Sequence, residues 1–303
     1  MTAGMALTIG NFDGVHRGHQ ELIKQVCAIA REHGWTSAAV TFDPHPTKLL
    51  APQRAPKLLM PLEARIAQMK RYGLDEVMCL PFDHAMASLS PDQFAQQVLK
   101  DKLDAKAVVV GDNFRFGHKQ AGDVHALAEL GAKYGFLTQA IGAVVVRGRI
   151  ASSSAIRHLL AAGEVSKACR LLNRPFSIEG TIVSGHGIGT KQTVPTLNLD
   201  TNAEVLPANG VYITSTLLPG HDQPVPSITN IGMRPTFGGD KLTIETFLLG
   251  PFTEQPTTIT LFFHRHVREE QQFPSPEALR TQIMKDVGRA NAYWRRVPKW
   301  DTL

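Results

Sequence analysis

The sequence has few cysteines and no long hydrophobic run. Its three cysteines, Cys27, Cys79 and Cys169, are widely spaced among 303 residues and form no Cys-x-x-Cys pair. Neither a disulfide framework nor a structural zinc site is therefore expected. No apolar stretch is long enough to cross a bilayer, and Met1–Ile9 is too short for a signal peptide. We expect a cytoplasmic protein with no membrane partner.

The sequence also lacks runs of basic residues, although it is basic overall. Lys and Arg number 32 against 27 Asp and Glu, which gives a net charge of +5. The arginines stand singly or in pairs beside Gly, Ser and Pro instead of forming a basic cluster. This distribution favours small phosphorylated ligands over nucleic acid, so we expect no nucleic-acid partner.

The first half of the chain alternates short apolar runs with amphipathic stretches. The runs expected to form strands are Ala6–Ile9, Ala38–Phe42, Glu76–Leu80, Ala107–Val110 and Phe136–Ala140. The stretches expected to form helices are 18–33, 62–72, a segment that begins at Ser90, 123–134, 154–162 and 165–172. This order predicts an α/β domain with a Rossmann-like parallel sheet and helices on both faces.

The second half contains short strands separated by Gly and Pro clusters. The expected strands are 176–183, 211–217, 227–231, 241–249 and 258–264, followed by one helix over 275–293. This pattern predicts a small β-barrel with a C-terminal helix. We place the domain boundary near residue 173, where the α/β alternation stops, which gives domains 1–173 and 174–303.

A glycine-rich segment, Gly10–His19, follows the first strand and opens the first helix. Open α/β sheets bind ligands at this end of a strand, and the free N–H groups of the helix attract phosphate. His16 and His19 lie one helical turn apart, where two imidazoles can stabilise charge on a transferred phosphoryl group. Two alternatives remain, namely ordinary surface histidines and a zinc pair, for which the turn supplies only Asp13 as a further ligand.

Three later segments lie at comparable positions in the first half. Phe42–Pro46 ends the second strand, and its prolines stiffen a loop. Gly111–Gly117 offers charged groups and two aromatic rings that would suit a flavin, although a plain loop with buried rings is the alternative. Ser152–Arg157 places three hydroxyls and an arginine at a helix start, which suits ATP phosphates; a simple serine cap explains only one of them.

The segments Gly10–His19, Phe42–Pro46, Gly111–Gly117 and Ser152–Arg157 resemble the HxGH nucleotidylyltransferases, and in particular the bacterial bifunctional riboflavin kinase/FMN adenylyltransferase family. The resemblance implies that FMN phosphate attacks the α-phosphorus of ATP, which yields FAD and pyrophosphate. It implies His16, His19 and Arg157 as catalytic residues. The implied ATP contacts are Gly10, Asn11, Phe12, Asp13, Gly14, Gly18, Ser152, Ser153 and Ser154. The implied flavin contacts are His45, Asp112, Asn113, Phe114, Arg115 and Phe116.

A second glycine-rich loop, Gly180–Lys191, follows a strand in the second half. Backbone amides in such a loop can approach phosphates, and the oxygens of Thr196 and Asn198 can hold a magnesium ion that accompanies ATP. The spacing of Gly185, Gly187 and Gly189 resembles a dinucleotide-binding fingerprint. No βαβ unit surrounds it, so we reject that interpretation.

The second half is similar to riboflavin kinase domains through Pro195–Asn198, Gly210–Tyr212, Asn230–Phe237, Glu245 and Arg268–Glu269. The resemblance implies that Thr196 and Asn198 hold Mg²⁺ with ATP and that Glu245 deprotonates riboflavin for attack on the γ-phosphate, which yields FMN and ADP. The implied ATP contacts are Gly185, Gly187, Gly189, Lys191 and Thr196. The implied flavin contacts are Arg268 and Glu269. On pattern alone, a strand carboxylate such as Glu245 is more often solvated than catalytic.

The chain departs from the kinase pattern at three places. Thr190 replaces the usual arginine, Thr193–Val194 replaces Gly-Phe, and 253–256 replaces an Asp-Leu-Tyr-Gly turn. We therefore expect a bifunctional enzyme that makes FMN and FAD, with two alternatives. One is an FAD synthetase whose kinase half is weak or inactive, and the other is a non-catalytic flavin- or nucleic-acid-binding protein. The sequence does not indicate an oligomeric state.

Overall fold

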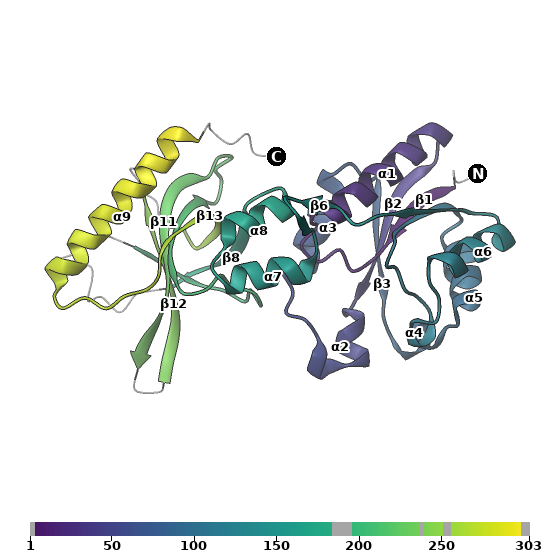
Figure 1. Cartoon of the computed structure of the whole chain (residues 1–303), viewed down its shortest axis with the longest axis horizontal. Helices are drawn as coiled ribbons and strands as arrows, with labels where there is room; N and C mark the ends of the chain where they lie inside the picture. The colour runs from purple at the N-terminus through teal and green to yellow at the C-terminus, as the bar shows by residue number, and fades with distance from the viewer. Residues whose placement is uncertain (1–3, 184–195, 237–238, 251–255, 298–303) are drawn as a thin grey trace. The chain divides into compact units, whose positions relative to one another are not determined.

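The computed structural model describes residues 4–183, 196–236, 239–250 and 256–297. Its internal contacts divide the chain into two compact units, 1–153 and 154–303. Among the residues that the structure describes, no helix is both long and apolar enough to cross a membrane. Each unit is described by itself below (Figure 1).

The first unit is built on a five-stranded parallel sheet in the order β3-β2-β1-β4-β5. Its strands are β1 Met5–Ile9, β2 Thr36–Asp43, β3 Glu76–Pro81, β4 Ala105–Gly111 and β5 Leu137–Ile141. All five strands expected from the apolar runs are present. The parallel sheet predicted from the alternating pattern is therefore confirmed.

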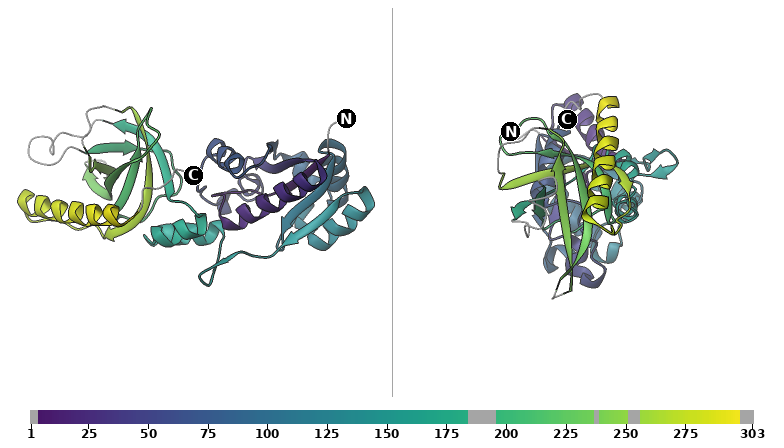
Figure 2. Two further views of the ribbon diagram at one scale, coloured as in Figure 1. Left: turned by 90° about the horizontal axis from the view of Figure 1, so that it is seen from above. Right: turned by 90° about the vertical axis from the view of Figure 1, so that its left-hand side faces the viewer.

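Helices cover both faces of this sheet (Figures 1 and 2). They are α1 Arg17–His33, α2 Pro46–Leu50, α3 Leu62–Arg71, α4 His84–Ser88, α5 Pro91–Gln93 and α6 Val124–Tyr134. Helix α5 continues as a π-helical segment, Phe94–Lys102. Short 3-10 turns occur at Pro52–Arg54 and His118–Gln120, and a small hairpin pairs β6 Val145–Val146 with β7 Arg149–Ile150.

Alternation along each strand produces two hydrophobic layers. Ala6 of β1 packs with Ile23 of α1 and Met69 of α3 on one face. Leu7 packs with Phe94 and Leu127 on the other face. Successive strand side chains point to opposite faces, so one strand serves both layers. The polar groups that follow β1, β2 and β4 are consequently placed at one edge of the sheet, where parallel strands end together.

The second unit is a closed six-stranded barrel in the order β10-β11-β12-β9-β8-β13, and its strands enclose the core in Figure 2. The strands are β8 Phe176–Val183, β9 Leu197–Asp200, β10 Gly210–Leu217, β11 Val225–Thr236, β12 Gly239–Leu248 and β13 Thr258–Arg268. The predicted barrel is confirmed. Strand β9 was not expected, because it is short and overlaps the Pro195–Asn198 segment.

Helix α9 (Pro276–Arg296) packs on the outside of the barrel, as the yellow helix in Figure 1 shows. Its Ala290 is fully buried against Val211, Ile213 and Ile228. The inside of the barrel carries a chain of buried hydroxyls that hydrogen-bond to one another. They belong to Thr214, Thr216, Ser227, Thr229 and Thr246. These bonds satisfy the polar groups that the barrel interior would otherwise leave unpaired.

Two helices precede the barrel, α7 Ser153–Ala161 and α8 Val165–Leu172. The Ser166 hydroxyl donates to the carbonyl of His264 at 2.8 Å, and the Cys169 thiol donates to the carbonyl of Phe263 at 3.2 Å. These contacts tie α8 to β13, so the two helices group with the barrel. The contacts thus divide the chain at 153/154, whereas the sequence pattern changes near residue 173.

Candidate functional sites

The turn between β1 and α1 has an unusual backbone. Phe12 has a φ of 50°, Gly14 of 80° and Val15 of 41°. Only Gly adopts positive φ without cost, and each of the other two residues costs on the order of 1–3 kcal/mol. Phe12 and Val15 are both buried in the core beside α1. Their packing therefore holds the turn in a conformation that an isolated peptide would leave.

His16 and His19 come together at this turn. Their rings stack with centroids 3.7 Å apart, and His16, the residue before the first turn of α1, is only 7% exposed. The ring of Phe12 contacts His19 edge-on at 5.1 Å. A Cβ on Gly18 would lie 3.0 Å from Cε1 of His16, so glycine leaves the space that the imidazole occupies. The predicted histidine pair thus sits at the helix N-terminus, where phosphate is favoured.

Two residues expected to contact ATP also fasten the turn. The Asp13 carboxylate is buried and accepts the N–H of Leu59 at 2.9 Å. The Asp13 carbonyl accepts the Ser153 hydroxyl at 2.8 Å. Among the residues that the structure describes, no three His, Cys, Asp or Glu side chains are grouped so as to hold a metal ion, so the zinc alternative gains no support. A direct role for Asp13 and Ser153 in ATP binding stays a prediction.

The structure adds Arg65 of α3, which the sequence analysis missed. Its side chain is 2% exposed, and its Nη1 donates to the carbonyl of Asn11 at 2.7 Å. Thr41 of β2 donates to the same carbonyl at 3.4 Å. Burial lowers the pKa of Arg65, and the Asp13 carboxylate is the strongest of the groups that oppose this. A charged residue four positions before the buried Met69, on the inner face of α3, is the signal that points to it.

The predicted flavin contacts lie in two loops of the first unit. His45 is buried, and its Nδ1 accepts the N–H of Thr47 at the start of α2. Phe116 is 6% exposed and packs in the core beside Phe94, while Phe114 is half-buried and stacks on it at 5.6 Å. The ring of Phe116 is therefore buried in the core. This agrees with the alternative interpretation of the segment as a loop with buried rings.

The polar members of the second loop are exposed. Asp112 and Asn113 lie at the end of β4, beside the end of β5. Arg115 is 3.9 Å from the Asp123 carboxylate, which precedes α6. These side chains are accessible to a ligand, and their contact with flavin stays a prediction.

The serine-rich segment spans the division between the two units. Ser152 and Ser153 belong to the first unit, and Ser154 and Arg157 belong to the second. Ser154 is exposed and Arg157 is half-buried, both on α7. Their roles toward ATP stay predictions.

In the barrel, three polar residues lie directly opposite one another on adjacent strands, and we call this set the register row. Glu245 of β12 lies opposite Asn198 of β9 and Asn230 of β11. Directly opposed residues share a face of an antiparallel sheet, so these three side chains lie on one face. Ile244 and Thr246, on either side of Glu245, are buried. Glu245 itself is half-buried and lies on the opposite side of strand β12 from these two neighbours.

The other kinase residues are only partly described. Thr196 is exposed just before β9, two residues from Asn198. The predicted phosphate-loop residues lie outside the described residues; they are Gly185, Gly187, Gly189 and Lys191.

Arg268 continues the same register row, because it pairs with Val211, which in turn pairs with Asn230. Its Nε donates to the buried carboxylate of Asp286 on α9 at 2.8 Å, and its own side chain is 17% exposed. Arg268 thereby fastens α9 to the barrel. Any contact with flavin would have to come from its remaining N–H groups.

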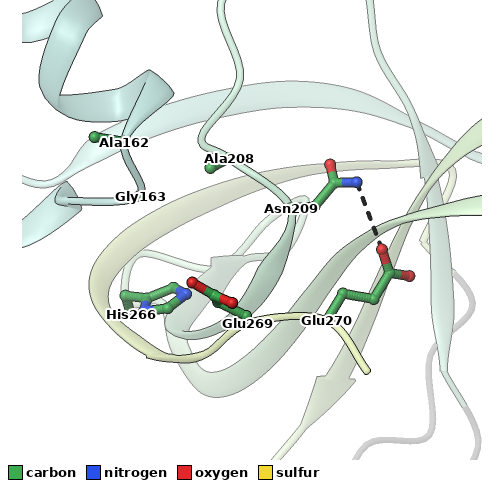
Figure 3. Close-up of a pocket in the computed structure, with 7 residues that line it drawn as sticks. All are labelled: Ala162, Gly163, Ala208, Asn209, His266, Glu269 and Glu270. Carbon is green, nitrogen blue, oxygen red and sulfur yellow. Dashed lines mark hydrogen bonds between the residues drawn. The ribbon is translucent and has the colours of Figure 1, made fainter. Parts of the chain in front are cut away.

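Glu269 lines a pocket of about 370 Å³ in this unit (Figure 3). Asn209, His266 and Glu270 also line it, with Ala162 and Gly163 from the loop between α7 and α8. The Glu270 carboxylate accepts the N–H of Met233 at 3.3 Å and lies within 3.5 Å of Asn209 Nδ2. Burial lowers the pKa of His266, which favours the neutral imidazole. The sequence analysis named Glu269 here and missed the other lining residues.

Comparison with known proteins divides the chain into two matched regions. The FAD synthetase family model matches residues 1–155, and the riboflavin kinase model matches residues 172–294. The bifunctional riboflavin kinase/FMN adenylyltransferase of Pseudomonas fluorescens is 39% identical over 95% of this chain and 93% of its own. The chain belongs to this family. It is a riboflavin kinase and an FMN adenylyltransferase.

A second relative has the same description, and a solved structure shares the fold. The bifunctional riboflavin kinase/FMN adenylyltransferase of Escherichia coli K12 is 35% identical over 93% of this chain and 90% of its own. A crystal structure described as a macrolide-efflux protein from Streptococcus pneumoniae superposes with a TM-score of 0.86 at 25% identity, covering 96% of this chain and 95% of its own. Neither alternative reading, a chain with a weak kinase half or a non-catalytic binder, gains support from these relatives.

Proposed function

We propose that the two activities of this family use two chemically separate sites in this chain. FMN adenylylation takes place at the histidine turn after β1, and riboflavin phosphorylation takes place at the register row around Glu245. The observation that carries the proposal is the placement of the predicted residues. The stacked His16–His19 pair belongs to the first unit, and the opposed Asn198 and Glu245 belong to the second.

For adenylylation, the phosphate oxygen of FMN attacks the α-phosphorus of ATP and pyrophosphate leaves, so no covalent enzyme intermediate is required. His16 and His19 donate hydrogen bonds to phosphate oxygens as charge develops there. Their fixed ring stack supplies positioning before the reaction begins. Arg157 adds a positive charge toward the departing phosphates, and the loop Asp112–Phe116 contacts FMN.

For phosphorylation, Glu245 accepts the proton of the terminal ribityl hydroxyl of riboflavin as that oxygen attacks the γ-phosphorus of ATP. ADP leaves and FMN forms. The half-buried position of Glu245, between two buried neighbours, fixes its backbone while leaving its carboxylate able to reach a substrate. Arg268, in the same register row as Glu245, and the adjacent Glu269 contact the flavin.

The kinase residues suit magnesium ions. Mg²⁺ prefers hard oxygen ligands and is commonly held by one or two protein groups together with substrate phosphates. The hydroxyl of Thr196 and the amide oxygen of Asn198 are such donors, and Asn198 lies directly opposite Glu245. When bound with ATP, the ion would neutralise phosphate charge. We propose Mg²⁺ for the divalent metal that ATP-dependent enzymes of this family use.

We further propose that the domains are 1–173 and 174–303 and that the protein works in the cytoplasm without nucleic-acid or membrane partners. The matched ranges 1–155 and 172–294 support a boundary between them, with α7 and α8 in the interval. We count these helices with the first domain because the α/β alternation of the sequence continues through them, although their contacts group them with the barrel. The scattered arginines support small phosphorylated substrates.

The test is chromatography of the products after incubation with Mg²⁺ and ATP, with riboflavin in one reaction and FMN in another. We expect FMN and FAD from riboflavin and FAD from FMN. FAD from FMN alone would show that Thr190, Thr193–Val194 and the altered 253–256 segment disable the kinase. The absence of product in both reactions would contradict the proposal as a whole.

A further inference from the structure

The adenylylation turn is held by residues that are distant in sequence. Arg65 lies 54 positions from Asn11, whose carbonyl it binds, and Leu59 lies 46 positions from Asp13, whose carboxylate it binds. Both residues come from α3 or the segment just before it. The segment 59–65 thus donates hydrogen bonds to both ends of the short run Asn11–Asp13.

Arg65 differs from an ordinary surface arginine of the same helix. Its side chain is 2% exposed, whereas Arg71, six positions later on α3, is exposed. Its Nε has no hydrogen-bond partner among the described residues. The negative charges of nearby Asp13 and Asp43 raise the pKa of Arg65 and so favour its charged form. Burying a guanidinium with an unpaired N–H lowers the stability of the fold. We therefore look for a functional role for Arg65.

The contact with Asn11 fixes the direction of a peptide group. The bond between Asn11 and Phe12 is trans, so the Asn11 carbonyl and the Phe12 N–H point in opposite directions. Because Arg65 and Thr41 both hold the carbonyl, the Phe12 N–H is aimed away from α3. Phe12 has a positive φ, which a non-glycine residue keeps only when its surroundings enforce it.

We propose that Arg65 is a positioning residue for adenylyl transfer. It holds the Asn11–Phe12 peptide so that the turn presents its N–H groups to the phosphates of ATP. This role rests on the adenylylation assigned to the turn. Arg65 does not touch the substrate, so its effect passes through the backbone of Asn11 and Phe12.

The test compares Arg65→Met and Arg65→Lys with Arg71→Met as the matched control. For FMN adenylylation, Arg65→Met lowers kcat about a hundredfold, the size seen when one preorganised donor is lost, and raises KM for ATP much less. Arg65→Lys lowers kcat about tenfold, because an ammonium keeps the charge but lacks the planar fork. Arg71→Met leaves kcat unchanged. Riboflavin phosphorylation by the same proteins stays at the parent rate.

Thermal unfolding of each variant separates positioning from stability. A purely structural role would lower the unfolding temperature and leave kcat per folded molecule unchanged at 15 °C, which would overturn the proposal. An equal loss in Arg71→Met would do the same. If Arg65→Met does not fold, Arg65→Lys decides, and parent-level kcat in that variant overturns the proposal. Failure of the parent protein itself to make FAD would instead contradict the proposed function.

Discussion

The residues of the two sites differ in how deeply the fold buries them. At the turn proposed for adenylylation, Phe12, Asp13 and His16 are all buried, and hydrogen bonds from Leu59, Arg65 and Ser153 reach the turn from other parts of the chain. At the row proposed for the kinase reaction, Asn198, Asn230 and Glu245 are half-buried on the surface of three strands.

This difference suggests two ways of placing a reactive group. The turn is costly for the backbone and depends on distant contacts, so changes far from the histidines are expected to disturb it. The kinase row depends on strand register, which the whole barrel fixes through regular backbone pairing. Single substitutions at the row are therefore expected to remove chemistry without moving the fold.

The largest expected effect comes from Glu245→Gln. Loss of a general base lowers the rate of riboflavin phosphorylation by roughly a hundredfold to ten-thousandfold. FAD formation from FMN stays at the parent rate. Steady-state assays of both steps measure this, with Glu179→Gln, an exposed carboxylate of β8, as the control. A parallel loss of both steps would show that the row also supports the other site.

His16→Ala is expected to lower FAD formation from FMN about a hundredfold, because a preorganised hydrogen-bond donor to the reacting phosphate is lost. Riboflavin phosphorylation is expected to be unaffected. The control is His33→Ala, an exposed histidine at the other end of α1. If both variants lose the same activity, the stacked pair has no special role.

Gly18→Ala is expected to lower FAD formation about tenfold. The added Cβ would lie 3.0 Å from Cε1 and 3.1 Å from Nδ1 of His16, so the ring must shift by a few tenths of an ångström. The comparison is Gly142→Ala in the same unit, where nothing lies within 4 Å of an added Cβ. Equal rates in the two variants would mean that the ring position is not critical.

A smaller effect, on stability alone, is expected from His264 in the barrel. Burial lowers its pKa from 6.5 to about 4, and its Nε2 lies 2.9 Å from the Ser215 hydroxyl. Between pH 6.5 and 4 the unfolded chain binds a proton that the folded barrel does not. The contribution of His264 to the free energy of unfolding is therefore fully present above pH 6.5. It decreases by up to about 3 kcal/mol as the pH is lowered through this range. Denaturant unfolding across this range measures the loss.

His264→Gln is expected to flatten that pH dependence, because glutamine can keep a hydrogen bond to Ser215 but does not titrate. His221→Gln, at an exposed position of the same unit, is the control. An unchanged slope in His264→Gln would assign the pH dependence to other groups.

Much of this fold follows from local sequence patterns. Apolar runs such as Val108–Val110 predict buried parallel strands, and alternation around Glu245 predicts which neighbours turn inward. The glycine turn before α1 is predictable because the strand, the glycines and the histidines are adjacent in the chain.

The contacts that hold the sites are not local, which is why the sequence analysis missed them. Arg65 reaches Asn11 only because α3 packs against the sheet, and Asn230 meets Glu245 only through the register of β11 and β12. Phe116 illustrates a choice that the local pattern left open, because its loop allowed either a ring that contacts flavin or a buried ring, and the core beside Phe94 buries it.

The central claim is that the two activities use chemically separate sets of residues, and a mixing experiment tests it most directly. His16→Ala and Glu245→Gln proteins are incubated with riboflavin, ATP and Mg²⁺, first separately and then together, and the flavins are separated by chromatography. We predict that the first protein stops at FMN, that the second makes almost no product, and that the mixture makes FAD. Accumulation of FMN without FAD in the mixture would show that Glu245 is needed for adenylylation and would contradict the account.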